Sequence, residues 1–273
     1  MSAIESIIYG FVSGLAEFMP VSPQAHQSIL MRLFGLSVRE PIRDMLVHIA
    51  ILIALVTTCR TLFSHFKISS RTHNRHNRRV APRQEIYDIR LAKTAVFPLL
   101  IGLLFYFTTR KLETNHLVLV LFLILNGIII IIPEYARHGN KDARFMSGGD
   151  AVIIGLLGAA SIFPGISRIA AIDSYTTLRG VSRTNSINWL FLLSVPVLVI
   201  WIFIDLILLF ILPIAKITFI SILHYLLSAL SAYFGGYLSI ALMRYLSVHT
   251  GYSAFAYYSW GAAMLTFVLY LIA

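Results

Sequence analysis

Residues 14–28, GLAEFMPVSPQAHQS, bring acid–base and nucleophilic groups into an apolar stretch of the chain. Glu17 supplies a carboxylate, Ser22 a hydroxyl and His26 an imidazole, and two prolines in the same stretch disrupt a helix. A carboxylate can hold a divalent cation or orient a proton, and a serine or histidine can attack or carry a proton. Because a charge in so apolar a segment is costly, we interpret this stretch as functional.

A second interrupted stretch, FPGISR at residues 163–168, has the composition of an anion site. Pro164 and Gly165 break a helix, and Ser167 and Arg168 follow at the start of the next one. Backbone N–H groups at a helix start bind phosphate well, and an adjacent arginine adds a positive charge. The sequence therefore predicts that Gly165, Ser167 and Arg168 bind phosphate groups.

Each of these side chains also has a purely structural interpretation, which the sequence leaves open. Glu17 could be a helix-end group at the membrane interface, and Arg168 could extend its guanidinium to a lipid headgroup. His26 could be a hydrogen-bonded packing residue. Ser22 and Ser167 could cap the helices that follow them.

The composition indicates an all-α integral membrane protein. Of the 273 residues, 58% are hydrophobic and 12% are charged, whereas about a quarter of the residues of a soluble domain are charged. Spans near the ~20 residues needed to cross a bilayer predict six transmembrane helices, at about 44–59, 91–109, 115–133, 186–209, 218–243 and 252–272. Two more apolar segments, about 3–34 and 150–182, are interrupted by proline, glycine, serine and a charge. We expect these two to form re-entrant helical hairpins.

The net charge is +10, and the clustering of the basic residues indicates a signal that orients the protein in the membrane and not a nucleic-acid binding surface. Nine of the 22 lysines and arginines lie in residues 60–93, and the positive-inside rule places such a loop in the cytoplasm. The same orientation makes residues 134–149 a cytoplasmic loop. The aromatic run at 253–260 is typical of interfacial anchors. A single cysteine, Cys59, excludes an internal disulfide.

An internal repeat links the two interrupted segments. Shifted by 145 positions, residues 8–38 align without a gap with residues 153–183, and eight of the 31 aligned pairs are identical. Three predicted crossings lie between the copies, so the second copy enters the membrane from the opposite face. We therefore predict one membrane domain built as an inverted repeat, with halves of about 1–133 and 150–273. In such proteins the helix breaks usually meet near the midplane and form the binding site.

At these residues the sequence resembles the bacitracin-resistance family of undecaprenyl-diphosphate phosphatases. SGLAEFMPVSPQAH at 13–26 is similar to the family's first motif, E/Q-G-x-x-E-F-x-P-[VI]-S-S-x-x-H, and PGISRIAAI at 164–172 is similar to its second, P-G-x-S-R-S-G-x-T. The resemblance covers essentially the whole chain. It implies a multi-pass protein of the inner (plasma) membrane whose site opens to the extracytoplasmic side. It also implies an enzyme that removes one phosphate from a polyprenyl diphosphate for lipid-carrier recycling.

The resemblance implies a role for each matched residue. Arg168 would clamp the diphosphate, and Glu17 would bind a divalent cation, Mg²⁺ or Ca²⁺. Ser22, Ser167 or His26 would be the nucleophile or the proton carrier. The expected partners are the lipid substrate and the membrane, without nucleic acid, and a homodimer is left open.

Three positions depart from the family motifs. Ser13 stands where the family has a carboxylate or amide, Pro23 where it has a second serine, and Ile172 where it has a hydroxyl. Losing a carboxylate weakens a metal site, because hard divalent cations seek several oxygen ligands. Asp173 is a candidate replacement for the missing hydroxyl, although on a helix it points about 100° away from its neighbour. We therefore weigh the phosphatase against a non-catalytic polyprenyl-phosphate binding protein or flippase of the same fold.

Overall fold

A computed structural model describes residues 1–36, 39–63, 83–109, 111–112, 115–136, 139–141, 145–212 and 217–272, with the side chains of residues 83–89 left undescribed. Most of the predicted basic loop at 60–93 lies outside these residues, as does part of the predicted loop at 134–149.

Six helical spans in this part of the chain are long and apolar enough to cross a membrane, which confirms the predicted crossings. They are α3 (Pro41–Thr58), α5 (Arg83–Leu104) with α6 (Tyr106–Thr109), α7 (His116–Ile131) with η2 (Ile132–Tyr135), α10 (Arg183–Ile211), α11 (Phe219–His249) and α12 (Ser253–Ile272). Two boundaries differ most: α5 begins at Arg83, whereas the sequence predicts a start near residue 91, and α11 continues to His249, whereas the sequence predicts an end near residue 243.

Each of the two interrupted segments forms a pair of shorter helices joined by a turn. The first pair is α1 (Ala3–Glu17) and α2 (Pro23–Leu33), and the second is α8 (Gly148–Ala159), continued by η4 (Ala160–Ile162), and α9 (Arg168–Leu178). At 1.5 Å per residue, the 15 residues of α1 fall short of a ~30 Å hydrocarbon core. The lengths therefore suit hairpins that return within the membrane.

The same capping interactions begin and end both pairs, at positions 145 residues apart. The equivalent features are a capping box that starts each pair (Ser2 with Glu5, Ser147 with Asp150), a serine N-cap after each turn (Ser22, Ser167) and a glycine of positive φ after each pair (Gly35, Gly180). Each such cap satisfies backbone groups that a helix end leaves unpaired. Ser37, which the repeat pairs with Ser182, lies outside the described residues.

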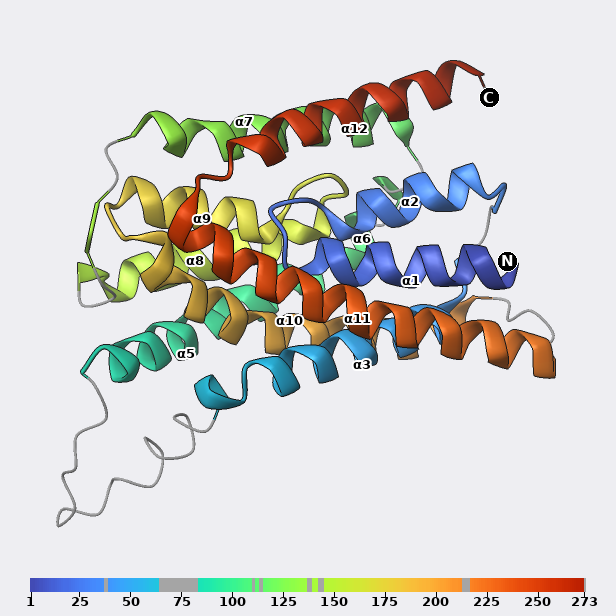
Figure 1. Cartoon of the computed structure of the whole chain (residues 1–273), viewed down its shortest axis with the longest axis horizontal. Helices are drawn as coiled ribbons and strands as arrows, with labels where there is room; N and C mark the ends of the chain where they lie inside the picture. Colours follow the sequence, from blue (N-terminus) through green and yellow to red (C-terminus); the bar gives the residue numbers. More distant parts are fainter. Residues whose placement is uncertain are drawn as a thin grey trace, which may run out of the picture.

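The helices also pack in equivalent pairs (Figure 1). α1 packs on α11 and α8 packs on α5, while α3 contacts α11 and α10 contacts α5. α7 and α12 lie side by side along one edge, and α3 packs on α10. If each helix is exchanged for its equivalent in the other half, each of the contacts named above becomes another of them or remains itself. This is the arrangement expected of the proposed inverted repeat.

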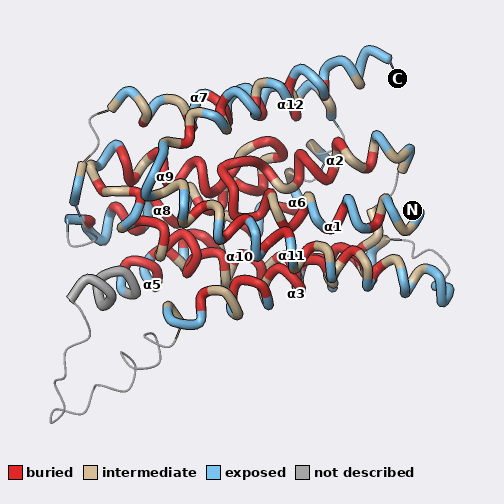
Figure 2. Tube along the Cα trace, in the orientation of Figure 1, coloured by how far each residue is buried: buried red, intermediate tan, exposed pale blue. Residues whose placement is uncertain are grey.

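Burial is concentrated around the two short helix pairs (Figure 2). The turn residues Phe18 and Ser22 are fully buried, and so are large side chains of α10 such as Trp189 and Phe191. The outer faces of the long spans expose large apolar side chains, for example Phe219 and Ile272. This distribution suits a protein whose outer surface contacts lipid and whose interior holds the polar groups.

Candidate active site

The two turns expected to form the site contact each other directly. The backbone N–H of Gly165 donates to the Ser22 hydroxyl oxygen at 3.0 Å, and the Ser167 hydroxyl donates to the Met19 carbonyl at 3.2 Å. Both serines are buried. The predicted convergence of residues 14–28 and 163–173 is therefore confirmed.

Local sequence explains why each chain turns here. α2 begins at Pro23, which has no N–H to lose at a helix start, and Ser22 caps it by accepting from the Ala25 N–H at 3.4 Å. In the second turn Gly165 adopts a φ of 111°, a conformation that side chains with a Cβ rarely adopt. A Cβ there would lie 2.7 Å from the Phe122 Cβ, so both the angle and the space require glycine.

Arg168 and Glu17 form a buried ion pair that joins the two turns. Arg168 Nη1 donates to Glu17 Oε1 at 2.7 Å, and Nη2 donates to the Glu17 carbonyl at 3.1 Å and to the Ser194 hydroxyl at 3.0 Å. The side chains are 4% and 3% exposed, respectively. Arg168 Nε is buried and has no hydrogen-bond partner among the residues that the structure describes. Since a buried unsatisfied donor costs free energy, this N–H is available to an incoming acceptor.

Asn126, in the middle of the apolar helix α7, connects both turns to α12. Its Oδ1 accepts from the Ser167 N–H at 2.8 Å, and its Nδ2 donates to the Pro20 carbonyl at 3.2 Å and to the Ser259 hydroxyl at 3.1 Å. Asn126 is fully buried. The sequence analysis missed this residue, although a lone amide inside an apolar span is itself a signal.

His26 lies on the first turn of α2 and faces a different space. Its Nδ1 is 2.7 Å from the Ser22 carbonyl and its Nε2 is 2.7 Å from the Tyr258 hydroxyl. His26 and Tyr258 line an apolar cavity of about 390 Å³ between α1, α2 and α12. Neither Glu17 nor Arg168 lines that cavity. The structure thus joins His26 to the paired turns through Ser22 and not by direct contact with the ion pair.

The predicted site residues are therefore brought together in two groups. Glu17, Ser22, Ser167 and Arg168 meet in the buried contact between the turns, whereas His26 faces the apolar cavity. The capping interpretation holds for both serines, because each hydroxyl accepts a backbone N–H of its own helix. The Gly165 N–H, predicted to hold phosphate, is bound to Ser22 in this conformation.

The three departures from the motifs have structural explanations. Ser13 donates to the Tyr9 carbonyl at 2.7 Å, Pro23 begins α2, and Ile172 is buried in the hydrophobic core. Asp173 does not replace the missing hydroxyl, because its Oδ2 accepts from Arg183 Nε at 3.0 Å. Ser13, Pro23 and Ile172 therefore contribute to helix structure and packing. None of the three adds an acidic side chain at the turns.

The donor set does not fit a cation cage made of protein groups alone. Among the described residues no group of three histidine, cysteine, aspartate or glutamate side chains is placed to hold a metal ion. Glu17, the predicted ligand, is engaged by Arg168, and hard divalent cations seek several oxygen ligands. No step of the reaction proposed below therefore passes through a metal ion.

A further buried polar network runs along α3 beside the first hairpin. Asp44 accepts from the Tyr9 hydroxyl at 2.8 Å and from Arg39 and Arg43 at 3.2 Å each. Deeper on α3, His48 Nδ1 lies 2.6 Å from an Asp205 oxygen on α10. The sequence analysis assigns no function to these charges, and their mutual pairing satisfies them.

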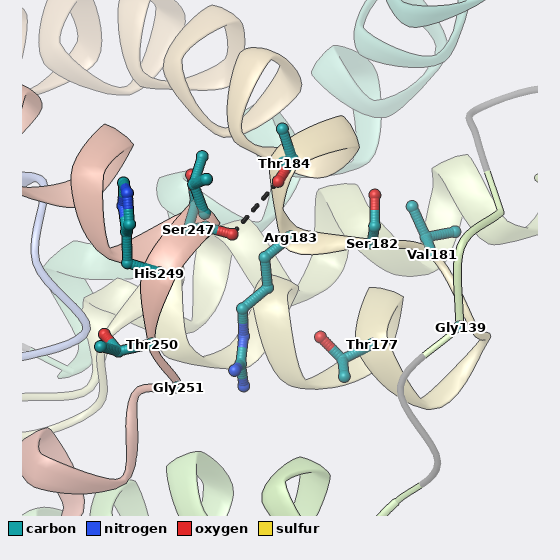
Figure 3. Close-up of a pocket in the computed structure, with 11 residues that line it drawn as sticks. Gly139, Thr177, Val181, Ser182, Arg183, Thr184, Ser247, His249, Thr250 and Gly251 are labelled. Carbon is teal, nitrogen blue, oxygen red and sulfur yellow. Dashed lines mark hydrogen bonds between the residues drawn. The ribbon is translucent and has the colours of Figure 1, made fainter.

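A second cavity, of about 360 Å³, lies where the ends of α9, α10 and α11 meet (Figure 3). Arg183 lies between Thr177 and His249, and the Thr184 hydroxyl donates to the Ser247 carbonyl at 3.2 Å. None of the predicted site residues lines this cavity. The candidate site is therefore the contact between the turns together with the apolar cavity beside it.

In the described part of the chain, six helices long and apolar enough to span a membrane, together with two buried, ion-paired helix breaks, define a polytopic α-helical membrane protein with an internal polar site. The chain belongs to the bacitracin resistance protein BacA family, whose model matches residues 6–265. It is 27% identical to the undecaprenyl-diphosphatase of Carboxydothermus hydrogenoformans over 98% of both chains. It is 31% identical to the undecaprenyl-diphosphatase of Desulforudis audaxviator over 72% of this chain and 74% of that one. The family resemblance of the two motifs is thereby confirmed.

Proposed function

We propose that this protein is a membrane phosphatase that hydrolyses undecaprenyl diphosphate to undecaprenyl phosphate and so returns the lipid carrier for envelope polymer synthesis. The observation that carries the proposal is the buried Arg168 guanidinium at the meeting point of the two turns. An arginine in a low-dielectric interior is a strong diphosphate ligand. Family membership and the names of the relatives supply the substrate.

In the proposed reaction, a water oxygen attacks the terminal phosphorus while the bond from that phosphorus to the bridging oxygen breaks. The products are inorganic phosphate and undecaprenyl phosphate, and the proton lost by the water must be accepted nearby. Arg168 would neutralise the phosphate oxygens, using Nε and the N–H groups now held by Glu17. Stabilising charge in a water-poor site is usually the largest contribution to such catalysis.

His26 is the proposed proton acceptor, because its Nε2 faces the cavity that an apolar chain can enter. Ser22 and Ser167 are weaker candidates for the attacking group, since their oxygens accept helix N–H groups and are buried. In our proposal they hold the turns. Glu17 would hold Arg168 in place until the diphosphate displaces its carboxylate.

The membrane setting follows from the sequence pattern. The short hairpins suit re-entrant segments, and from the positive-inside rule we propose that the basic loop at 60–93 faces the cytoplasm and that the protein lies in the inner (plasma) membrane. We propose that the site opens to the extracytoplasmic side, as the family resemblance implies. The homodimer that the sequence leaves open is not part of this proposal.

Phosphate release by purified full-length protein in lipid nanodiscs, with undecaprenyl diphosphate as substrate, tests the proposal. Parallel reactions with Mg²⁺, with Ca²⁺ and with a chelator show whether a divalent cation is needed. Arg168→Ala should abolish release, whereas Arg90→Ala, at an exposed position, should retain it. Tight binding of undecaprenyl phosphate without any phosphate release would instead support the non-catalytic binding protein or flippase.

A further inference from the structure

Tyr258 of α12 makes a specific polar contact within the aromatic run that the sequence assigns to interfacial anchoring. Its hydroxyl lies 2.7 Å from His26 Nε2, and the two rings are nearly parallel, with an interplanar angle of 3° and centroids 5.5 Å apart. The two residues are 232 positions apart in the chain. Tyr257, its neighbour, packs edge-to-face against Trp260 instead.

The hydrogen bonds of His26 fix the position of its proton. The Ser22 carbonyl can only accept, so in the neutral imidazole Nδ1 carries the hydrogen. Nε2 therefore presents its lone pair, and the Tyr258 hydroxyl donates to it. Two partners on opposite ring nitrogens hold both the tautomer and the ring plane.

Among the described residues, only His26 and Tyr258 line this cavity with polar side chains, so no other lining side chain can donate to Nε2. The remaining lining side chains are apolar: Val12, Leu15, Ala16, Met19, Val21, Ala254 and Phe255. Tyr258 is 52% exposed at the outer surface of α12, so it is not held in place by burial. Its hydroxyl can leave Nε2 when another donor arrives.

We propose that Tyr258 is a positioning residue for the hydrolysis, and this inference rests on the proposed function. Tyr258 keeps the Nε2 lone pair of His26 directed into the cavity in the resting protein. The attacking water replaces the Tyr258 hydroxyl as donor to that lone pair and gives up its proton there. Tyr258 itself makes no bond to phosphorus and carries no charge in the reaction.

The test is the steady-state kinetics of phosphate release by full-length Tyr258→Phe in nanodiscs, with Tyr257→Phe as the matched control. Tyr258→Phe should lower kcat about tenfold to a hundredfold, as expected for a lost group that orients a histidine, and leave KM and the thermal unfolding midpoint near the wild-type values. In a His26→Gln background the same change should have no further effect. A structural role would instead lower the unfolding midpoint and add to the loss in that background.

The outcomes separate this inference from the proposed function. Wild-type turnover with an unchanged kcat in Tyr258→Phe overturns the inference alone. Absence of turnover in the wild type overturns the proposed function and the inference with it. ¹⁵N NMR of labelled histidine gives an independent readout, since Tyr258→Phe should shift the His26 Nε2 resonance, whose hydrogen bond is lost, and Tyr257→Phe should not.

Discussion

Arg168, the first residue of α9, donates a 2.7 Å hydrogen bond to the carboxylate of Glu17, which ends α1. The two residues are 151 positions apart and both are buried. A buried charge that loses its partner is strongly destabilising, because the remaining charge keeps its desolvation cost. Breaking this ion pair should therefore lower the stability of the protein as well as disrupt the site.

Glu17→Ala should lower the free energy of unfolding by ~3–5 kcal/mol, because it leaves the Arg168 guanidinium buried without its carboxylate. Glu17→Gln should cost less, since the amide oxygen can still accept from Nη1. Chemical denaturation in detergent micelles measures both changes. Equal losses for the two variants would mean that the pair does not hold the turns together.

Gly165→Ala should destabilise the protein by about 1–3 kcal/mol, because a φ of 111° strains an alanine. The added Cβ would also lie 2.9 Å from the backbone nitrogen of Leu123. Gly261→Ala in α12 is the control, since a Cβ at Gly261 meets no atom within 4 Å and alanine favours a helix. A thermal unfolding series in which Gly261→Ala is the more damaging change would contradict this account.

Asn126→Leu should lower the free energy of unfolding by about 1–3 kcal/mol, because the Ser167 N–H and the Pro20 carbonyl both lose a buried partner. Ser259→Ala removes one bond to Asn126 and one to the Leu123 carbonyl, but it leaves the Ser167 N–H and the Pro20 carbonyl paired with Asn126 and should cost less. Thermal unfolding of both variants in micelles measures the difference. If the leucine variant were as stable as the wild type, the amide would not connect the turns.

Asp150 lies in the first turn of α8, outside the six spans. Its contacts predict that the protein loses stability in acid. Burial by itself would raise the pKa of this carboxyl, but hydrogen bonds from Tyr175 and Ser147 and the charge of Arg179 lower it to about 2. A lowered pKa in the folded protein means that the stabilisation is complete above the ordinary value of 3.8 and is lost as the pH falls towards 2.

The measurement is the unfolding midpoint of wild type and Asp150→Asn from pH 6 down to ~2. The wild type should be the more stable of the two at pH 6, and the difference should shrink steadily below about pH 4. A difference that stays constant over this range would show that the charge of Asp150 contributes nothing.

The sequence predicted the fold well because hydrophobic length is a local property. The six spans follow from runs of apolar residues, and the 145-residue offset identified Ser22 and Ser167 as equivalent positions before any contact was known. Both serines prove to be helix caps. Serine and proline at the first break, and serine, proline and glycine at the second, encode the turns directly.

The partners of the site residues could not be predicted in the same way. Ser194 and Asn126 each lie between apolar neighbours in a long helix, and nothing in their spacing indicates which residue they bind. Tyr258 lies in the aromatic run at 253–260, and the composition of that run predicts an interfacial anchor. Only the packing of α12 against the first hairpin brings its hydroxyl to His26.

The most direct test of the central claim, that the two turns form one site, is a double-mutant cycle on phosphate release from undecaprenyl diphosphate. The variants are Glu17→Gln, Arg168→Lys and the two combined, compared by kcat/KM in nanodiscs. Because the side chains are in contact, we predict that the double variant loses about as much activity as the worse single variant. Losses that simply multiply would show that Glu17 and Arg168 act independently, and would contradict a shared site.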